Sequence, residues 1–88
     1  SSGQEMYPLV MEGELQRIVG RNLRLHRQRM GLSQERFADH LGVHRTYMGG
    51  LERGERNLTL KALERIADLI SVDPRSLMVE PPANAESD

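Results

Sequence analysis

The residue types that most often do chemistry in proteins form no complete catalytic or metal site in this sequence. His40 and His44 are four residues apart, a spacing that could place two metal ligands on one helix. Gly42 lies between them and is expected to end that helix, and neither a cysteine nor a matching acidic cluster supplies further ligands. A nucleophile with a paired base is also missing. The sequence therefore predicts a protein that is not an enzyme and has no metal, cofactor or small-molecule ligand.

Arginine and hydroxyl side chains offer a second chemistry, the recognition of nucleic acid. Arg45 can donate two parallel hydrogen bonds to guanine O6 and N7, and Thr46 can offer its methyl group to thymine or its hydroxyl to a phosphate. Residues 17–65 carry eleven Lys/Arg and five Asp/Glu, whereas residues 1–16 and 66–88 have net charges of −3 and −4. Because salt screens charges within about 8–10 Å, this local basic field would attract DNA although the whole chain has a net charge of −1.

A twenty-residue window that begins at Gln34 indicates how these side chains would be positioned. Ala38, at its fifth position, must be small where two helices cross closely. Gly42, at its ninth, can take the left-handed conformation that turns the chain sharply between those helices. The apolar residues expected to fill the angle between them are Phe37, Leu41, Val43, Met48 and Leu51. A rigid pair of this kind can insert the outer face of its second helix into a major groove.

The apolar residues recur at helical spacing, and no alternation typical of strands persists. The chain is therefore predicted to be all-α, with five helices. Ser33 and Thr59 are expected N-caps, and Asp73-Pro74 would open the last and shortest helix. The predicted helices cover residues 11–30, 34–41, 45–53 and 60–70 and a short segment around Leu77.

Three segments are expected along the chain. Residues 1–10 would form a flexible N-terminal arm, 11–79 the folded domain, and 80–88 a disordered, Pro-rich acidic tail or linker. No apolar run approaches the length of a membrane span, the N-terminus lacks the pattern of a signal peptide, and cysteine is absent. These features favour a cytoplasmic protein without a membrane partner.

The run GLSQERFADHLGV followed by LERGERN resembles the Cro/C1-type (XRE) helix-turn-helix family over residues 17–79. Within that family, HRTYMGGLERGERNLTLKALERI is most similar to the controller proteins of restriction-modification systems. The resemblance implies a compact lambda-repressor-like domain that binds a palindromic double-stranded DNA operator as a homodimer, with its third helix in the major groove. It also implies a transcriptional regulator, acting as repressor or activator, that is associated with the nucleoid.

The expected DNA contacts follow from the residue types together with the resemblance. Base reading is expected from Arg45, Thr46, Gly49 and Arg56. Contacts with the DNA backbone are expected from Gln34, Tyr47, Arg53 and Asn57. Structural alternatives stay open, since Tyr47 could pack on the domain's own surface and Arg53 and Asn57 could stabilise a turn. The resemblance also implies a structural ion pair between Arg27 and Glu52.

Two departures from the family pattern leave alternatives. Gly50 matches a controller-like glycine, whereas position 49 usually carries a polar side chain, and each glycine costs about 1 kcal/mol relative to alanine inside a helix. Gly49 would either let the backbone approach DNA closely or remove one base contact. His26 stands where the family usually has a leucine. It is expected to be a hydrogen-bonded histidine whose protonation at about pH 6 would loosen the core.

A protein-interaction role is the main alternative to DNA binding alone. Ile18 and Leu25 mark a second face of the first helix, and residues 77–79 are apolar. The arm is apolar at Tyr7, Leu9, Val10 and Met11. These residues would either close the core within one chain or form a two-fold dimer interface. The alternative functions with a protein partner are an antitoxin-type regulator, or the DNA-binding half of a larger sensor protein that also binds a protein partner.

Overall fold

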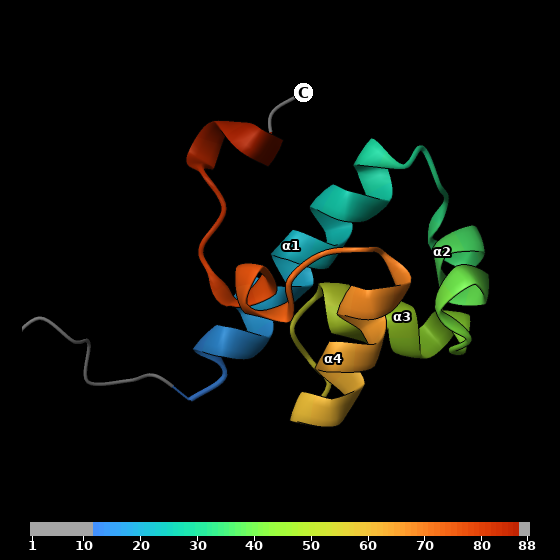
Figure 1. The fold of residues 1–88 in the computed structure, drawn as a ribbon, viewed down its shortest axis with the longest axis horizontal. Helices are drawn as coiled ribbons and strands as arrows, with labels where there is room; N and C mark the ends of the chain where they lie inside the picture. Colours follow the sequence, from blue (N-terminus) through green and yellow to red (C-terminus); the bar gives the residue numbers. More distant parts are fainter. Residues whose placement is uncertain (1–11, 87–88) are drawn as a thin grey trace, which may run out of the picture.

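Four α-helices and two short 3₁₀-helices make up residues 12–86, the part of the chain that a computed structural model describes (Figure 1). The α-helices are α1 (Glu14–Arg29), α2 (Gln34–Leu41), α3 (Arg45–Glu52) and α4 (Leu60–Leu69), and the 3₁₀-helices are η2 (Pro74–Met78) and η3 (Ala83–Glu86). These residues contain no strand, which confirms the all-α class. None of the helices among them combines the length and apolar character needed to cross a lipid bilayer. The predicted arm, 1–10, lies outside the described residues.

The first helix begins at Glu14, three residues later than predicted. Gly13 precedes it in the left-handed conformation, with a φ of 87°, and residues 12–13 form a turn. Glycine adopts this conformation without the steric penalty that a Cβ atom brings, so it turns the chain where the apolar periodicity alone predicted continuous helix. The helix ends at Arg29 with Met30 as its C-cap, one residue before the predicted end.

The fifth predicted helix is a 3₁₀-helix rather than an α-helix, so the count of five α-helices is not confirmed. Asp73 caps η2 as expected, because its Oδ1 accepts a hydrogen bond of 2.9 Å from the N–H of Arg75. Pro74 takes the first position of the helix. Only five residues are helical before Val79 becomes extended, a length at which 3₁₀ geometry is common.

Every main element contributes one large, fully buried side chain to a single core. Leu23 comes from α1, Phe37 from α2, Met48 from α3, Ile66 from α4 and Leu77 from η2. Burying an apolar side chain of this size stabilises the fold by about 1.5–3 kcal/mol. Because Met48 is packed among the other four, α3 has a fixed orientation relative to the rest of the domain.

The first helix crosses the end of α3 at Gly20, with the two backbones in close contact. A Cβ atom on Gly20 would lie 2.6 Å from the carbonyl oxygen of Glu52 and would also collide with that of Leu51. Only a hydrogen atom fits between these groups. Gly20 therefore sets the distance between α1 and the C-terminal end of α3, a role that no local sequence pattern indicates.

After η2 the chain runs back along α1, held by a buried amide. The polar residue Asn22 is buried, with 8% of its surface exposed. Its Nδ2 donates hydrogen bonds of 2.8 Å to the carbonyl oxygens of Leu77 and Val79. Both donor hydrogens of the amide are thereby used, and the end of η2 is attached to the middle of α1.

The described part of the expected tail, residues 80–86, also makes contacts with α1. Glu80 forms an ion pair with Arg21, and Pro81 is buried and lines a small hollow together with Leu25. Leu25 is itself buried. One of the two residues that marked the second face of the first helix is therefore covered within the chain, while Ile18 is half-buried.

Candidate nucleic-acid interface

The turn between α2 and α3 is fixed by local hydrogen bonds. Gly42 is left-handed, with a φ of 71°, and the N–H of Val43 donates to the carbonyl oxygen of Ala38 at 3.0 Å. His44 then caps α3, because its Nδ1 accepts a hydrogen bond of 3.2 Å from the N–H of Thr46. A ring nitrogen that accepts a hydrogen bond carries no proton, so this cap requires an imidazole without a proton on Nδ1.

His40, the other histidine of the possible metal pair, also has a hydrogen-bonding partner within the domain. His40 Nε2 lies 3.1 Å from the carbonyl oxygen of Leu69, which links α2 to the end of α4. Within residues 12–86 no group of three or more His, Cys, Asp or Glu side chains is arranged to hold a metal ion. Each histidine of the pair thus has a hydrogen-bonding partner of its own in the fold.

The third helix has a buried face and an exposed face. Met48 and Leu51 are buried in the core, whereas Arg45 and Thr46 are exposed at its first turn. Neither exposed side chain makes a hydrogen bond or ion pair with another described residue. Arg45 and Thr46 are therefore accessible to a ligand outside the domain, and no segment among residues 12–86 covers them.

Gly49 lies beneath two polar side chains of the same chain. A Cβ atom on Gly49 would come within 3.2 Å of Arg53 Nη1 and 3.3 Å of Gln34 Oε1. The glycine is buried, although it was expected to face DNA. The structure thus adds a packing explanation to the two considered from the sequence: without a side chain at position 49, Gln34 and Arg53 can lie close together over α3.

A largely buried ion pair connects α1 with the end of α3. Arg27 Nε and Nη2 donate to the two carboxylate oxygens of Glu52 at 2.7 and 3.1 Å, and Arg27 Nη1 donates to the carbonyl oxygen of Leu32 at 3.1 Å. Gln34 Nε2 donates to Glu52 Oε1 at 3.0 Å. Only 4% of the Glu52 side chain and 17% of the Arg27 side chain are exposed. The pair implied by the family resemblance is present, and through Glu52 it also fixes the amide of Gln34 at the start of α2.

On the other side of α3, Arg56 folds back along the helix over Gly50. A Cβ atom on Gly50 would lie 2.8 Å from both Cγ and Nε of Arg56. The guanidinium carbon of Arg56 is 5.7 Å from the centre of the Tyr47 ring, a distance at which the cation is attracted to the ring face. Arg56 is exposed and Tyr47 is half-buried, so the ring serves as a platform for the arginine.

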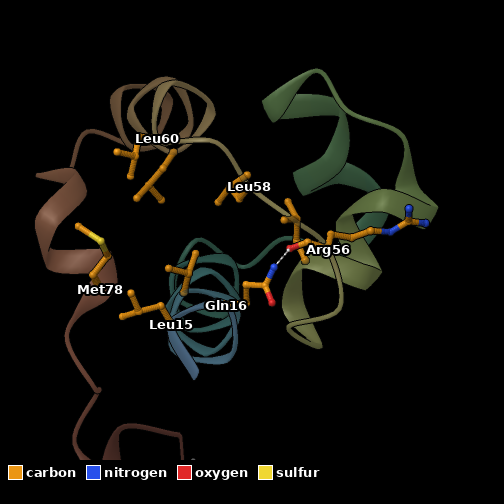
Figure 2. Close-up of a pocket in the computed structure, with 9 residues that line it drawn as sticks. Leu15, Gln16, Arg56, Leu58, Leu60 and Met78 are labelled. Atoms are coloured by element: carbon orange, nitrogen blue, oxygen red, sulfur yellow. Dashed lines mark hydrogen bonds between the residues drawn. The ribbon is translucent and has the colours of Figure 1, made fainter. Parts of the chain in front are cut away.

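The loop that carries Arg56 is held by a residue near the start of α1. Gln16 Nε2 donates to the carbonyl oxygen of Arg56 at 3.1 Å (Figure 2) and to Oδ1 of Asn57 at 2.7 Å. Tyr47 Oη donates to the carbonyl oxygen of Asn57 at 3.4 Å. Asn57 therefore has the turn-stabilising contacts that were one of its two expected roles. Gln16 was not among the expected site residues, because its partners are forty and forty-one positions away.

Arg53 is the C-cap residue of α3 and forms an exposed ion pair. Its Nε lies 3.0 Å from Oε1 of Glu55, and both side chains are largely in solvent. Exposed pairs of this kind are usually worth less than about 1 kcal/mol. The pairing therefore does not prevent Arg53 from contacting an anion outside the domain.

Six of the candidate site residues thus form two groups beside α3. One group contains Gln34, Gly49 and Arg53, and it is braced from behind by the Arg27–Glu52 pair. The other contains Tyr47, Arg56 and Asn57, and it is braced by Gln16. Arg45 and Thr46 are exposed at the start of the helix and belong to neither group.

His26 differs from the expectation of a hydrogen-bonded core histidine. It is half-buried, and its ring makes no hydrogen bond with another described residue. Burial lowers the pKa of His26 below its usual value, and the positive charge of Arg29 acts in the same direction. The neutral imidazole is therefore favoured in the folded domain, with water able to reach part of the ring.

A family model described as a helix-turn-helix domain matches residues 18–78. The chain belongs to this helix-turn-helix family. The control protein C.SmaI of Serratia marcescens is 38% identical over 65 residues, which cover 74% of this chain and 77% of the relative.

Solved structures of similar chains agree with this assignment. The restriction-modification controller protein C.AhdI from Aeromonas hydrophila matches with a TM-score of 0.63 and 40% identity, covering 70% of this chain and 94% of that chain. The hypothetical transcription factor NHTF from Neisseria matches with a TM-score of 0.72 and 33% identity, covering 85% and 86%. The resemblance to controller proteins and helix-turn-helix regulators is therefore confirmed.

Proposed function

We propose that this chain is a sequence-specific regulator of transcription that inserts α3 into the major groove of double-stranded DNA. The observation that carries the proposal is the division of α3 into a buried face and an exposed first turn. Met48 and Leu51 hold the helix in the core, and Arg45 and Thr46 project from it. The major groove, about 12 Å wide, admits an α-helix, and an arginine at its N-terminal end can pair with both acceptors of a guanine.

The two groups beside α3 would contact the DNA on either side of the base-reading turn. Gln34 and Arg53 are suited to the sugar-phosphate backbone, since both are polar and lie together over Gly49. Tyr47 and Asn57 would contact the backbone near the second group. Arg56, supported by the Tyr47 ring, is suited to a base edge, and Gly49 would act by leaving room for Gln34 and Arg53 to lie together at this surface.

The similarity to restriction-modification controller proteins favours a regulator of that type. Such a regulator would bind a palindromic operator as a homodimer, with two copies of α3 separated by about 34 Å, one turn of the duplex. Action on chromosomal DNA would place the protein in the cytoplasm, on the nucleoid. Attraction to DNA is supported by the basic charge of residues 17–65. Binding as a dimer is the docking geometry usual for helix-turn-helix regulators.

Selection of binding sites from a library of random duplexes tests the proposal. The unmodified chain should enrich one palindromic sequence, and its affinity should fall steeply with salt because bound phosphates release counterions. Arg45→Ala should then lose about 1–3 kcal/mol of preference for the selected site over random DNA. Arg53→Ala should weaken binding to both about equally and should reduce the salt dependence.

Arg24→Ala is the matched control, because Arg24 is an exposed arginine on α1 that lies in neither group of the candidate site. It should leave both the affinity and the preference close to those of the unmodified chain. Full retention of sequence preference by Arg45→Ala would show that α3 is not the base-reading element. Failure of the library to converge on any sequence would contradict sequence-specific binding itself.

A further inference from the structure

A small apolar groove lies between the start of α1, the loop after α3, the start of α4 and the end of η2 (Figure 2). Its volume is about 120 Å³. Apart from Gln16 and Arg56, its lining is entirely apolar. Figure 2 shows Leu15 and Leu60 on opposite sides of the opening, with Met78 between them on a third side.

Two of the leucines that line this groove, Leu15 and Leu60, are largely exposed although the core of the domain is well packed. Leu60 is 73% exposed, the highest value among the exposed large apolar side chains of the described residues, and Leu15 is 53% exposed. Apolar surface of this kind is stabilised when it is removed from water. Because the two leucines come from different helices and face the same space, one apolar side chain between them would cover both.

The size and chemistry of the groove favour a small apolar occupant. Pockets for small molecules usually measure about 300–1,000 Å³ and contain a few converging polar groups. Here the side-chain nitrogen of Gln16 already donates to Arg56 and Asn57. A stable protein interface buries about 800 Å² on each partner, so this groove could be only a small part of one. The space fits one or two apolar side chains.

The sequence contains such side chains immediately before the described residues. Residues 6–11 read MYPLVM, in which every residue except Pro8 is apolar, and Glu12 follows them. Leu15, on the wall of the groove, is only three positions beyond Glu12. An extended chain spans about 3.5 Å per residue, so the five residues before Glu12 have ample length to reach the groove from the turn at Gly13.

We infer that this groove is the docking site of the N-terminal arm of the same chain, with one or two apolar side chains of residues 7–11 inserted between Leu15 and Leu60. The docked arm would also lie against Gln16 and Arg56, the residues that connect α1 with the loop after α3. Docking would therefore stabilise both the start of α1 and this loop. The inference stands on the groove and the arm and does not depend on the DNA-binding proposal.

Deletion of residues 1–11 in three backgrounds tests the inference. In the unmodified chain the deletion should lower Tm by about 4–8 °C, the shift typical of losing one buried contact in a domain of this size. In a Leu60→Ser chain the deletion should cost much less, because the docking site is already damaged. Leu69→Ser is the matched control, since Leu69 is another exposed leucine of α4 that does not line the groove. In the Leu69→Ser background the deletion should lower Tm as much as it does in the unmodified chain. An unchanged Tm after deletion, or an equal loss in the Leu60→Ser background, would overturn the inference.

Disulfide trapping identifies the occupant independently, because the chain contains no cysteine. A Val10→Cys/Leu60→Cys variant should form an intramolecular disulfide rapidly under mild oxidation, and faster than Val10→Cys/Leu69→Cys. Adding Leu15→Ser should abolish that difference in rate. Disulfide-linked dimers as the main product would show that a second copy fills the groove, and equal rates for the two pairs would show that the arm does not dock there.

Discussion

The side chain of Arg56 lies across Gly50 so closely that no Cβ atom could be added at position 50 without moving it. The hypothetical Cβ would be 2.8 Å from Cγ and from Nε of Arg56, whose guanidinium also lies over the Tyr47 ring. Glycine costs about 1 kcal/mol relative to alanine in the middle of a helix. Gly50 thus lowers the stability of α3 but leaves room for Arg56, the arginine proposed to contact a base edge of the DNA.

Gly50→Ala should displace Arg56 from the Tyr47 ring and weaken binding to a selected operator while the fold stays intact. The gain in helix propensity would be offset by the collision, so the free energy of unfolding should change little. Fluorescence anisotropy with labelled operator DNA measures the first effect, and urea unfolding measures the second.

The same substitution in an Arg56→Ala background separates the two effects. With the arginine side chain removed, the three atoms nearest to the new Cβ are gone, and alanine at position 50 should stabilise the domain by about 1 kcal/mol. It should then have no further effect on operator affinity. A gain in stability from Gly50→Ala that is the same with and without Arg56 would show that the two residues do not interact.

Arg27→Met should destabilise the domain by about 3 kcal/mol or more, because it leaves the buried carboxylate of Glu52 with only the amide of Gln34 as a side-chain partner. Urea unfolding monitored by circular dichroism measures the loss. The double variant Arg27→Met/Glu52→Leu should recover a large part of it, because no charge is then left buried.

Arg53→Met serves as the comparison for this prediction. It removes an arginine from an exposed ion pair with Glu55 and should cost less than about 1 kcal/mol. If Arg27→Met and Arg53→Met lower the free energy of unfolding equally, burial of the Arg27–Glu52 pair does not raise the cost of breaking it.

Gly20→Ala should be among the most destabilising single-methyl additions in the chain. The new Cβ atom would collide with the backbone carbonyl groups of Leu51 and Glu52, which cannot rotate aside as a side chain can. Forced overpacking of this kind typically costs about 1–3 kcal/mol. Thermal unfolding should show a lower Tm for Gly20→Ala than for Gly50→Ala, where only a flexible side chain has to move. The reverse order would indicate that the two helices can separate freely at Gly20.

His26 should make the stability of the domain decrease in mildly acidic solution. Burial and Arg29 lower the pKa of His26 in the folded state, so the unfolded chain binds a proton more readily. The contribution of the neutral ring is fully present above pH 6.5, the ordinary histidine value, and is lost as the pH falls from there through the folded-state pKa. Urea unfolding above and below this pH in the unmodified chain and in His26→Leu isolates the effect, since His40 and His44 are common to both. Parallel pH profiles for the two proteins would assign the loss to other groups.

The sequence by itself determined the features that depend on neighbouring residues. Ser33, Thr59 and Asp73 are side-chain caps in the structure, as predicted, because a cap bonds to an N–H only two or three positions away. The α2 boundaries were predicted correctly for the same reason, with Ser33 before the helix and Gly42 after it. The helix-turn-helix spacing and the family resemblance likewise lie within short, continuous runs of sequence.

Only the tertiary structure decided which distant residues meet. The bonds of Gln16 to the loop after α3 and the contact of Gly20 with the end of that helix join segments more than thirty positions apart. Their geometry depends on the angle at which α1 crosses α3, and that angle is set by the packing of the whole core. The packing of Arg56 over Gly50 depends likewise on the path of the chain after the helix. A glycine in a sequence does not reveal which side chain fills the space above it.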